Sequence, residues 1–436
     1  MTTVNEWAQE QWQSADLGDP RRTARAVRMG AQMATSPAAS LPGQTNHWGD
    51  LKAAYRLLHQ EKVTHEALSL PHWQATHRAA GTTTNPVLFI QDGSQLDFTF
   101  RDVEDIGRIG DNNGQGLLIH TTMAVDPAEP VSILGLAHQI VWVRHGEAYK
   151  RHETRMQRYH RADRESSHWS DAIAAIGPAP QGACWVSVGD RESDIFHYWK
   201  KAKGLGWECL LRLKSDRRIL AEDGTLFKLK SWLSKLPCMA KERLELRART
   251  GRTARMAQLS LAWGKIQILP PRNDPESNRA SPLTAWVLHI WECDAEEGQK
   301  PLEWILLSTL AVENAEQAYE RVEWYRRRWL IEQYHKALKT GCGMENSQLQ
   351  DGAALRRLLG FLSIVAVRLL QVETVARTAP KLPATRMVDP QMLTFVCALR
   401  KRDASTMTAY EFWREIAKCG GFLARKHDGE PGWQTL

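Results

Sequence analysis

The feature that decides how this chain folds is the stretch Tyr325-Arg-Arg-Arg-Trp-Leu-Ile-Glu-Gln-Tyr-His-Lys-Ala-Leu-Lys339. No Pro or Gly occurs from Asn314 to Thr340, and Gly341 follows, which predicts one long helix over this range. Residues three, four and seven positions apart share a helix face, so four polar residues are expected to lie together: Tyr325, Arg328, Glu332 and Lys339. Ordinary ion pairs on a solvated helix would give a similar pattern. A carboxylate between cations would also suit phosphates and a metal ion.

The composition predicts a multi-domain protein with a sizeable core. The chain has 436 residues, 43% of them hydrophobic, and a formal net charge of +7, which favours a polyanionic partner. No apolar run is expected to span a membrane, and the first residues lack the pattern of a signal peptide. Seven scattered cysteines without a Cys-x-x-Cys pair predict free thiols in a reducing cytoplasm.

Residues 1–75 are expected to form a helical N-terminal domain. Asp19-Pro20 is typical of a helix start, with Asp as the cap and Pro in the first turn. Arg21, Arg25 and Arg28 recur at helical spacing on this predicted helix, and Arg22 follows Arg21. Two interpretations stay open, a solvated amphipathic helix and a helix laid against DNA phosphates and base edges.

Two buried strands are each expected to end at an aspartate. Val87–Ile90 leads to Asp92, and Cys184–Val188 leads to Asp190. Residues 220–310 are rich in alternating strand patterns and predict a β-rich insertion before the Glu332 helix. A long apolar helix is predicted over 353–372, followed by a Pro-punctuated link at 380–390 and a short helix over 409–418.

Three carboxylates could meet at one site, because strand ends in an open α/β sheet converge at a crevice. Asp92, Asp190 and Glu332 would repel one another unless divalent cations neutralise them. Oxygen ligands favour Mg²⁺, and Mn²⁺ can substitute. Two such ions about 3.5–4 Å apart can promote in-line displacement at a phosphodiester.

The spacing Tyr-x2-Arg-x3-Glu-x6-Lys resembles a motif of the bacterial insertion-sequence-four family of cut-and-paste DDE transposases, and of its Tn-five branch in particular. Leu17 to Arg25 resembles the end-binding N-terminal domain of that family, and the resemblance runs from about Glu6 to Trp433. It implies an α/β fold in which an RNase-H-like mixed sheet is flanked by helices, with a β-rich insertion and helical N- and C-terminal regions. It also assigns the catalytic, metal-binding triad: Asp92, Asp190 and Glu332.

The resemblance implies further DNA contacts. Tyr325, Arg328 and Lys339 would grip the phosphates of the transposon end. Trp304 would stack on a base flipped from that end, although a core Trp opening a strand is the ordinary alternative. Arg212 and Lys214 match positions where the family contacts DNA, as Arg21, Arg22 and Arg25 do in the N-terminal domain.

The sequence departs from the family in two places. Gly93 and Ser94 follow Asp92 where the family tends to have two Thr, so one hydroxyl is lost. The family continues beyond the position of Leu436 with a helix that pairs two protomers, so residues 376–436 are expected to form a C-terminal helical region with a shortened dimerisation part.

The predicted function is a cut-and-paste DNA transposase that cuts transposon ends, through a hairpin intermediate, and joins them to target DNA. Residues 76–375 would form the catalytic domain. The partners would be double-stranded DNA and, in the synaptic complex, a second copy of the chain, with no membrane, in the bacterial cytoplasm at the nucleoid. Two alternatives stay open: an RNase-H-like nuclease without strand transfer, and an inactive DNA-binding inhibitor or regulator.

Overall fold

The computed structural model describes residues 3–111, 113–144, 157, 161, 164–246, 254–272, 280–295, 301–433 and 435. The chain forms two compact units, each described by itself below. The first unit comprises Met1–Val87, Asp92–Glu165 and Trp329–Leu436, and the second comprises Leu88–Gln91 and Ser166–Arg328.

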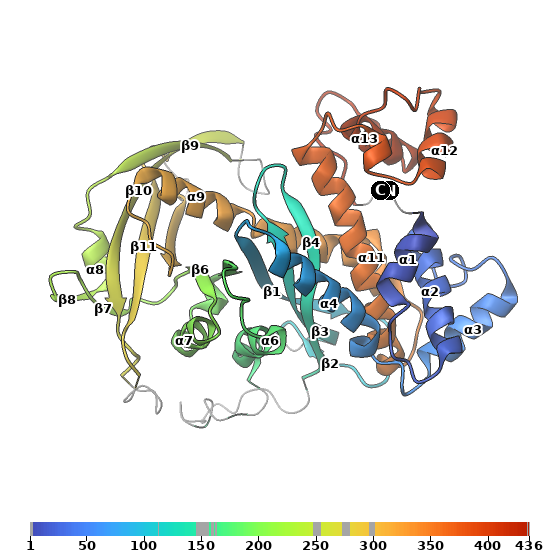
Figure 1. Cartoon of the computed structure of the whole chain (residues 1–436), viewed down its shortest axis with the longest axis horizontal. Coiled ribbons are helices and arrows are strands. Elements are labelled where there is room, and N and C mark those ends of the chain that lie inside the picture. Colours follow the sequence, from blue (N-terminus) through green and yellow to red (C-terminus); the bar gives the residue numbers. More distant parts are fainter. Residues whose placement is uncertain are drawn as a thin grey trace. The chain divides into compact units, whose positions relative to one another are not determined.

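The first unit is mainly helical around a small antiparallel sheet (Figure 1). Its N-terminal helices are α1 (Val4–Trp12), α2 (Pro20–Thr35), α3 (Trp48–Leu58) and α4 (His65–Thr82). Its strands are the end of β1 (Val87–Asp97), then β2 (Gly107–Ile109), β3 (Gly114–Asp126) and β4 (Ser132–Trp142), with β3 antiparallel to both β2 and β4. Its later helices are α10 (Trp329–Lys336), α11 (Gly352–Thr378), α12 (Pro390–Arg400) and α13 (Ala409–Cys419).

Local capping fixes where the N-terminal helices begin. Asp19 caps α2 by accepting the Arg21 N–H at 2.8 Å, and Pro20 occupies the first turn, as predicted. Thr3 and Glu6 form a reciprocal capping box at α1. These interactions satisfy backbone N–H groups that have no partner within the helix.

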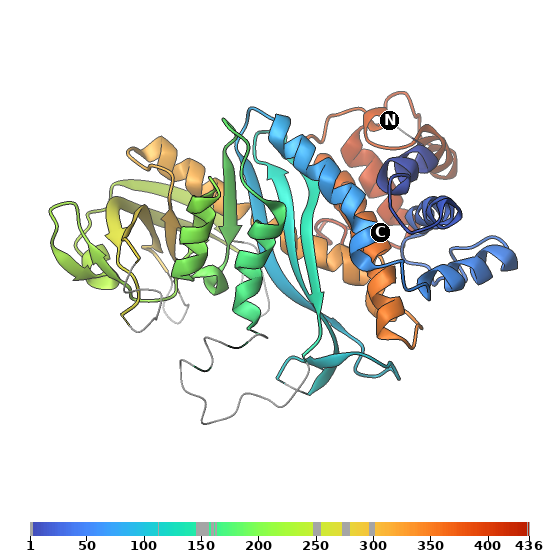
Figure 2. The ribbon, with the colours of Figure 1, turned by 60° about the horizontal axis from the view of Figure 1, so that its bottom comes forward.

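The core of the first unit lies where α4 and α11 pack against β4, and Figure 2 shows α4 running along this sheet. α11 agrees with the apolar helix predicted over 353–372, with Asp351 as its N-cap. Contrary to our expectation, α11 is long and apolar enough to cross a membrane by length and composition alone. However, 72% of its most apolar window is buried inside the structure, as in the core helix of a globular domain.

The C-terminal region contains a helix that the sequence reading missed. α13 agrees with the helix predicted over 409–418. α12 begins at the end of the stretch predicted as a link (380–390), where no helix was predicted. The missed signal was Asp389-Pro390, because the Asp389 side chain accepts the Gln391 N–H at 2.7 Å and Pro390 begins the helix.

The second unit is a mixed sheet with helices (Figure 1). Its strand order is β5-β6-β12-β11-β10-β7-β8, with residues Leu88–Gln91 of β1 beside β5 and with β9 on β10. β5 and β6 run parallel, whereas the pairs β6–β12, β12–β11, β11–β10, β10–β9, β10–β7 and β7–β8 run antiparallel, which confirms the mixed α/β class for the described residues. Its strands are β5 (Trp185–Gly189), β6 (Glu208–Arg212), β7 (Arg218–Leu220), β8 (Leu226–Lys228), β9 (Ala240–Leu246), β10 (Arg255–Ile268), β11 (Leu283–Glu292) and β12 (Glu303–Ser308).

The helices of this unit are α6 (His168–Ile176), α7 (Phe196–Gly204), α8 (Leu229–Leu233) and α9 (Ala315–Arg326). Part of its core is a group of aromatic rings, in which Phe89 lies 4.7 Å from Trp185 and 4.5 Å from Trp207, between ring centroids. The β-rich stretch predicted at 220–310 is confirmed, and β12 pairs with β6, so these strands extend the same sheet.

The prediction that a strand ends before Asp92 is wrong. β1 continues through Asp92 to Asp97, so this carboxylate lies within a strand. The side chains of Val87 to Gln91 are all buried, whereas from Asp92 onward half-buried or buried side chains alternate with exposed ones. A continuously buried half followed by an alternating half reads from sequence as two short strands.

The prediction of one helix from Asn314 to Thr340 is also wrong. α9 ends at Arg326, α10 begins at Trp329, and a π-helical turn (η4) occupies Ala337–Gly341. The N–H groups of Arg327 and Arg328 bond to carbonyls three residues back, which tightens the end of α9. Arg327 keeps helical dihedral angles, which require neither Pro nor Gly. No residue type in the sequence therefore marks this break.

Candidate active site

Asp190 lies where the prediction places it, directly after β5 in the second unit. Its Oδ1 accepts the Glu192 N–H at 2.8 Å, and its carbonyl accepts the Ser193 hydroxyl at 2.6 Å. These bonds shape a 3₁₀ turn over Arg191–Ser193. The Asp190 side chain is half-buried, so it is both fixed by the turn and reachable from solvent.

Arg212 and Trp304 lie on the same face of this sheet. Arg212 on β6 is paired with Leu306 on β12, and Trp304 precedes Leu306 by two residues, so all three point the same way. The Arg212 guanidinium also donates to the Glu303 carbonyl at 2.9 Å. Trp304 is half-buried rather than enclosed, which differs from an ordinary core Trp.

Tyr325 on α9 joins this face. Its ring meets the Trp304 ring edge to face, with centroids 5.7 Å apart, and the Arg212 guanidinium lies close enough to its hydroxyl to affect its pKa. Burial raises the pKa of Tyr325, and the Asp190 carboxylate raises it further, whereas Arg328 and Arg212 act in the opposite direction. The second unit therefore brings five predicted site residues into one group: Asp190, Arg212, Trp304, Tyr325 and Arg328.

Arg212 is itself partly desolvated in this group. Burial lowers the pKa of Arg212, although the neighbouring Tyr325 favours its charged form. Nearby Arg191 and Arg328 oppose its charge, so three guanidinium groups lie within electrostatic range of one another. Such a concentration of cations would be relieved by a phosphate.

Lys214 is exposed, and its backbone is held by a buried acid that the motif analysis had not singled out. The Asp194 carboxylate accepts the N–H groups of Lys214 and Ser215 at 2.9 and 2.7 Å, and the Arg217 Nε at 2.7 Å. The Asp194 side chain is fully buried, and the Arg217 guanidinium stacks 4.4 Å from the Trp199 ring centre. Asp194 thus ties the loop after β6 to the turn that follows Asp190.

In the first unit, Asp92 is half-buried within β1. The Gly93 N–H donates to its Oδ1 at 2.9 Å. Ser94 supplies the one hydroxyl that remains where the family has two Thr. It lies two residues after Asp92, on the same side of the strand, and is half-exposed. Gly93 itself does not have a positive φ angle, so this position does not require a glycine for its backbone conformation.

Glu332 is half-buried on α10, on the side opposite the buried Tyr334, and Ile331 and His335 are also buried. Lys339 lies in the π-helical turn, where the Cys342 N–H bonds to the Ala337 carbonyl at 2.7 Å. This wider turn rotates Lys339 away from the position that seven α-helical residues would give. The prediction that all four motif residues share one continuous helix face therefore fails.

Lys339 has acidic neighbours in the first unit. Its Nζ lies 3.7 Å from the Glu345 Oε1, which also accepts the Asp97 N–H at 2.9 Å. Hydrogen bonds from Thr99 lower the pKa of Asp97, and the Lys339 charge lowers it further. A DNA phosphate at Lys339 would therefore have to compete with Glu345.

Three partly exposed carboxylates form the donor set proposed for metal, and oxygen donors fit Mg²⁺ or Mn²⁺. Two of them, Asp92 and Glu332, belong to the first unit, and Asp190 belongs to the second. Within the described residues, no three His, Cys, Asp or Glu side chains form a cluster able to hold a metal ion. The convergence of the triad stays a prediction.

The three arginines predicted to contact DNA from α2 differ in their surroundings. Arg21 is 92% exposed and pairs with its own cap, Asp19, at 2.9 Å. Arg22 donates to the Leu17 carbonyl at 3.1 Å, and Arg25 pairs with Asp50 of α3 at 2.6 Å. Arg21 is therefore the one of these three that combines high exposure with a purely local partner. Arg25, by contrast, joins α2 to α3.

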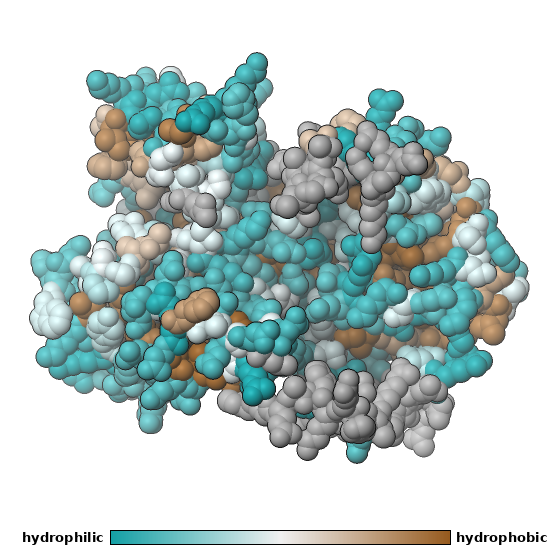
Figure 3. Space-filling view, turned by 180° about the vertical axis from the view of Figure 1, so that it is seen from behind, coloured by the Kyte–Doolittle hydropathy of each residue, from teal (hydrophilic) through white to brown (hydrophobic). Residues whose placement is uncertain are grey.

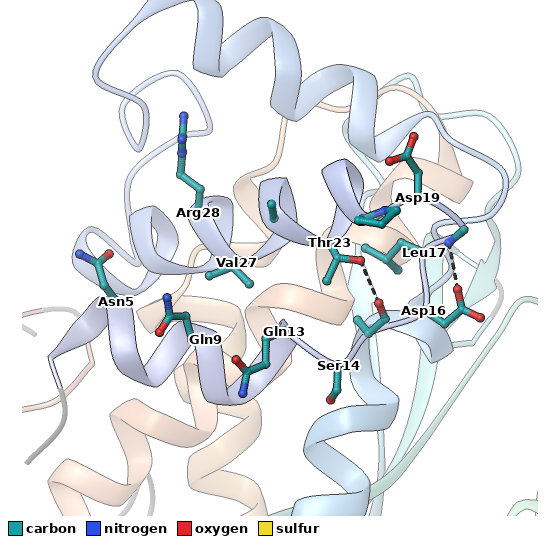
Figure 4. Close-up of a pocket in the computed structure, with 14 residues that line it drawn as sticks. Asn5, Gln9, Gln13, Ser14, Asp16, Leu17, Asp19, Thr23, Val27 and Arg28 are labelled. Carbon is teal, nitrogen blue, oxygen red and sulfur yellow. Dashed lines mark hydrogen bonds between the residues drawn. The ribbon is translucent and has the colours of Figure 1, made fainter.

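A polar hollow of about 980 Å³ lies between α1 and α2 in the same domain (Figure 4). The α1 side chains Gln9 and Gln13 face Thr23 of α2 across it. Arg21, Arg22 and Arg25 do not line this hollow, so the predicted arginines and the hollow occupy different parts of the domain surface.

Two protein-family models match the chain. Residues 4–63 match a transposase DNA-binding domain, and residues 186–368 match a transposase DDE domain, which together is more than half of the chain. The chain is a DDE transposase. The DDE match contains Asp190, Trp304, Tyr325 and Glu332, and begins after Asp92.

Among solved structures, this DDE transposase matches a cryo-EM structure of piggyBac transposase in a synaptic complex with hairpin DNA. The sequence identity is 9%, the match covers 98% of this chain and 83% of that one, and the TM-score is 0.39. A likeness at that level carries no argument about the site.

Asp194, Arg217 and Glu345 are the neighbours of the transposase site that motif reasoning did not assign. Asp194 lies four residues after Asp190, and no sequence spacing reveals that it receives bonds from the loop 20 residues later. Glu345 lies six residues after Lys339, and only the π-helical turn brings the two side chains together.

Proposed function

We propose that this DDE transposase moves DNA by cut and paste and belongs to the insertion-sequence-four family, near its Tn-five branch. The observation that carries the proposal is the group of Asp190, Arg212, Trp304, Tyr325 and Arg328 in one unit. An acid, cations and an aromatic platform in one group suit a DNA end whose strand is cut while a neighbouring base is displaced.

Mg²⁺, for which Mn²⁺ can substitute, would be held by Asp92, Asp190 and Glu332 and would activate the attacking oxygen and stabilise the leaving one. Arg212, Tyr325 and Arg328 would bind the phosphates beside the cut, with Lys339 contributing when phosphate displaces Glu345. Trp304 would stack on a base extruded from the DNA end. Arg21, Arg22, Arg25 and Lys214 would add contacts to the backbone.

The reaction would run in four steps at each end. Water cuts one strand, the freed 3′-hydroxyl attacks the opposite strand to form a hairpin, and a second water reopens the hairpin. The 3′-hydroxyl then attacks a phosphodiester of the target DNA and joins the two. We divide the chain functionally into an end-binding domain at 1–75, an RNase-H-like catalytic domain at 76–375 and a C-terminal region at 376–436.

We further propose that two copies act together through the C-terminal region. The side chains of Phe395 and Leu399 on α12 are 67% and 56% exposed and lie one helical turn apart. Figure 3 shows apolar residues on the surface of the C-terminal helices, at the upper left. An exposed apolar helix face supports association with a second copy, and Phe395→Asp should shift the dimer toward monomer in light scattering.

We propose that the protein acts in the cytoplasm of a bacterium, at the nucleoid during the reaction. All seven cysteines are free in the structure, which suits a reducing environment.

The decisive experiment is incubation of the full chain with candidate transposon ends, target DNA and Mg²⁺, with nicked, hairpin and joined products scored separately. All three products would establish the cut-and-paste transposase. Nicks without joined products would indicate a nuclease, and bound but uncut ends would indicate an inhibitor or regulator.

A further inference from the structure

A buried amide links five elements of the first unit. Gln139 lies on β4 directly opposite Thr121 of β3, and both side chains are almost completely buried. A buried amide is costly unless its hydrogen-bonding groups are satisfied. The partners of Gln139 therefore show what the structure gains by keeping it there.

All four hydrogen-bonding positions of the Gln139 amide are used. Its Nε2 donates to the Thr121 hydroxyl at 3.0 Å and to the Tyr334 hydroxyl at 3.1 Å. Its Oε1 accepts from the Ser363 hydroxyl at 2.8 Å and from the His65 Nε2 at 2.9 Å. Through these bonds β4 is connected to α4, β3, α10 and α11.

The bond to Tyr334 is the one that bears on the proposed site, because Tyr334 lies on α10, the helix that carries Glu332. α10 is eight residues long, it follows the break after α9, and it runs into the π-helical turn. Its other inward contacts include Ile331, which packs without a preferred direction. The directional bond between Gln139 and Tyr334 can fix the helix about its own axis.

Glu332 lies two residues before Tyr334, on the opposite side of α10. A rotation of the helix that loosened Tyr334 would therefore swing the Glu332 carboxylate. We propose that Gln139 is a positioning residue of this transposase, which sets the direction of Glu332 through Tyr334. The inference rests on the proposed metal-binding role of Glu332.

The test compares Tyr334→Phe and Gln139→Leu with a matched control, Gln371→Leu. Gln371 of α11 donates to the Ile133 carbonyl of β4 at 2.8 Å, so its replacement changes a contact between α11 and β4 and leaves the Gln139–Tyr334 bond in place. Tyr334→Phe removes one hydroxyl and keeps the ring, so it should fold even where Gln139→Leu does not.

The first measurement is hydrogen exchange of the full chain. Exchange of the α10 amides should rise in Tyr334→Phe and Gln139→Leu and stay at the wild-type level in Gln371→Leu. In the variant that combines Tyr334→Phe and Gln139→Leu, exchange of the α10 amides should rise no further than in the more affected single variant, because both changes break the same Gln139–Tyr334 bond. Unchanged α10 exchange in Tyr334→Phe would overturn the proposal.

The second measurement is Mn²⁺ binding by electron paramagnetic resonance, without DNA. Affinity should fall about 10- to 100-fold in the two test variants, the range found when partners of metal ligands are removed, and should not change in Gln371→Leu. Equal weakening in the control would reduce Gln139 to a general stabilising role. Wild-type protein that binds no Mn²⁺, with α10 exchange altered as expected, would refute the proposed metal function and leave the positioning bond established.

Discussion

The Trp304 ring stands edge-on to the Tyr325 ring, with centroids 5.7 Å apart and an angle of 63° between the planes. The contact joins β12, the last strand of the β-rich stretch, to α9, the helix that carries Tyr325 of the motif. In an edge-to-face contact each ring keeps at least one face for another partner.

Trp304→Ala should slow hairpin formation much more than the first nick, because stacking on an extruded base is worth about 1–3 kcal/mol. Time courses that resolve the two products would measure this, and Trp304→Phe, which keeps a stacking face, should recover part of the rate. Equal slowing of both steps would identify Trp304 as a packing residue.

Replacing any member of the triad with alanine, as in Asp92→Ala, Asp190→Ala or Glu332→Ala, should abolish Mg²⁺-dependent cleavage and leave DNA binding largely intact. Binding by gel shift and cleavage would be assayed on the same preparations. Asp223→Ala, which changes an exposed turn acid of the second unit, serves as the control. Normal cleavage by one triad variant would remove that residue from the site.

Asp194→Asn should destabilise the protein by about 3–5 kcal/mol, because it leaves the buried Arg217 guanidinium without its counter-charge. Denaturant unfolding would give the loss. Lys203→Gln instead removes the exposed cation of the pair with Glu208, and it should cost only about 0–1 kcal/mol. Similar losses in the two variants would show that Asp194 contributes little beyond a surface pair.

DNA affinity should fall steeply with salt, and Arg21→Ala should reduce the slope of log affinity against log salt by about 1. Arg25→Ala should lower the unfolding midpoint as well, because Arg25 links α2 to Asp50 of α3. Fluorescence anisotropy over a salt series and thermal unfolding would separate the two effects. A slope unaffected by Arg21→Ala would exclude that residue from the DNA surface.

Acid should destabilise the first unit through His72. Its Nδ1 bonds to the Gln11 Oε1 at 2.7 Å, its Nε2 accepts the Leu136 N–H at 2.9 Å, and burial lowers its pKa from 6.5 to about 4. As the pH falls, the unfolded chain binds the proton first, so stability is full above about pH 6.5 and declines toward pH 4, by roughly 3 kcal/mol.

Unfolding midpoints measured across this pH range would test the effect of His72. His72→Gln should make the decline shallower but not abolish it, because burial also lowers the pKa of His65 and of His138 to about 4. His427→Gln, at an exposed position, should leave the curve as in wild type. An equally steep decline in His72→Gln would assign the acid sensitivity to other groups.

The parts of the fold that depend on local chemistry could be predicted from sequence. Asp19-Pro20 announced the start of α2, and the buried run before Asp190 announced β5. Both signals lie within a few residues of what they determine. The same holds for α11, whose apolar residues mark it as a core helix.

The rest depended on partners distant in sequence. Nothing near Arg327 marks the end of α9, because the turn keeps helical angles and contains neither Pro nor Gly. Gln139 resembles any strand residue until Tyr334, nearly 200 positions later, is seen beside it. The family resemblance implied that Trp304 and Tyr325 both lie at the DNA end. That Asp194 is fully buried and pairs with Arg217 could be seen only in the structure.

The Asp194 carboxylate also limits how the chain can be altered. Because it receives the N–H groups of both Lys214 and Ser215, the loop after β6 has one permitted length, and an inserted residue would separate at least one donor from its acceptor. Peptide tags and circular-permutation breakpoints should therefore fail at this loop. They should be accepted at the exposed turn around Asp223, where the Thr225 N–H bonds only to Asp223 and Ala221 accepts from within the same turn.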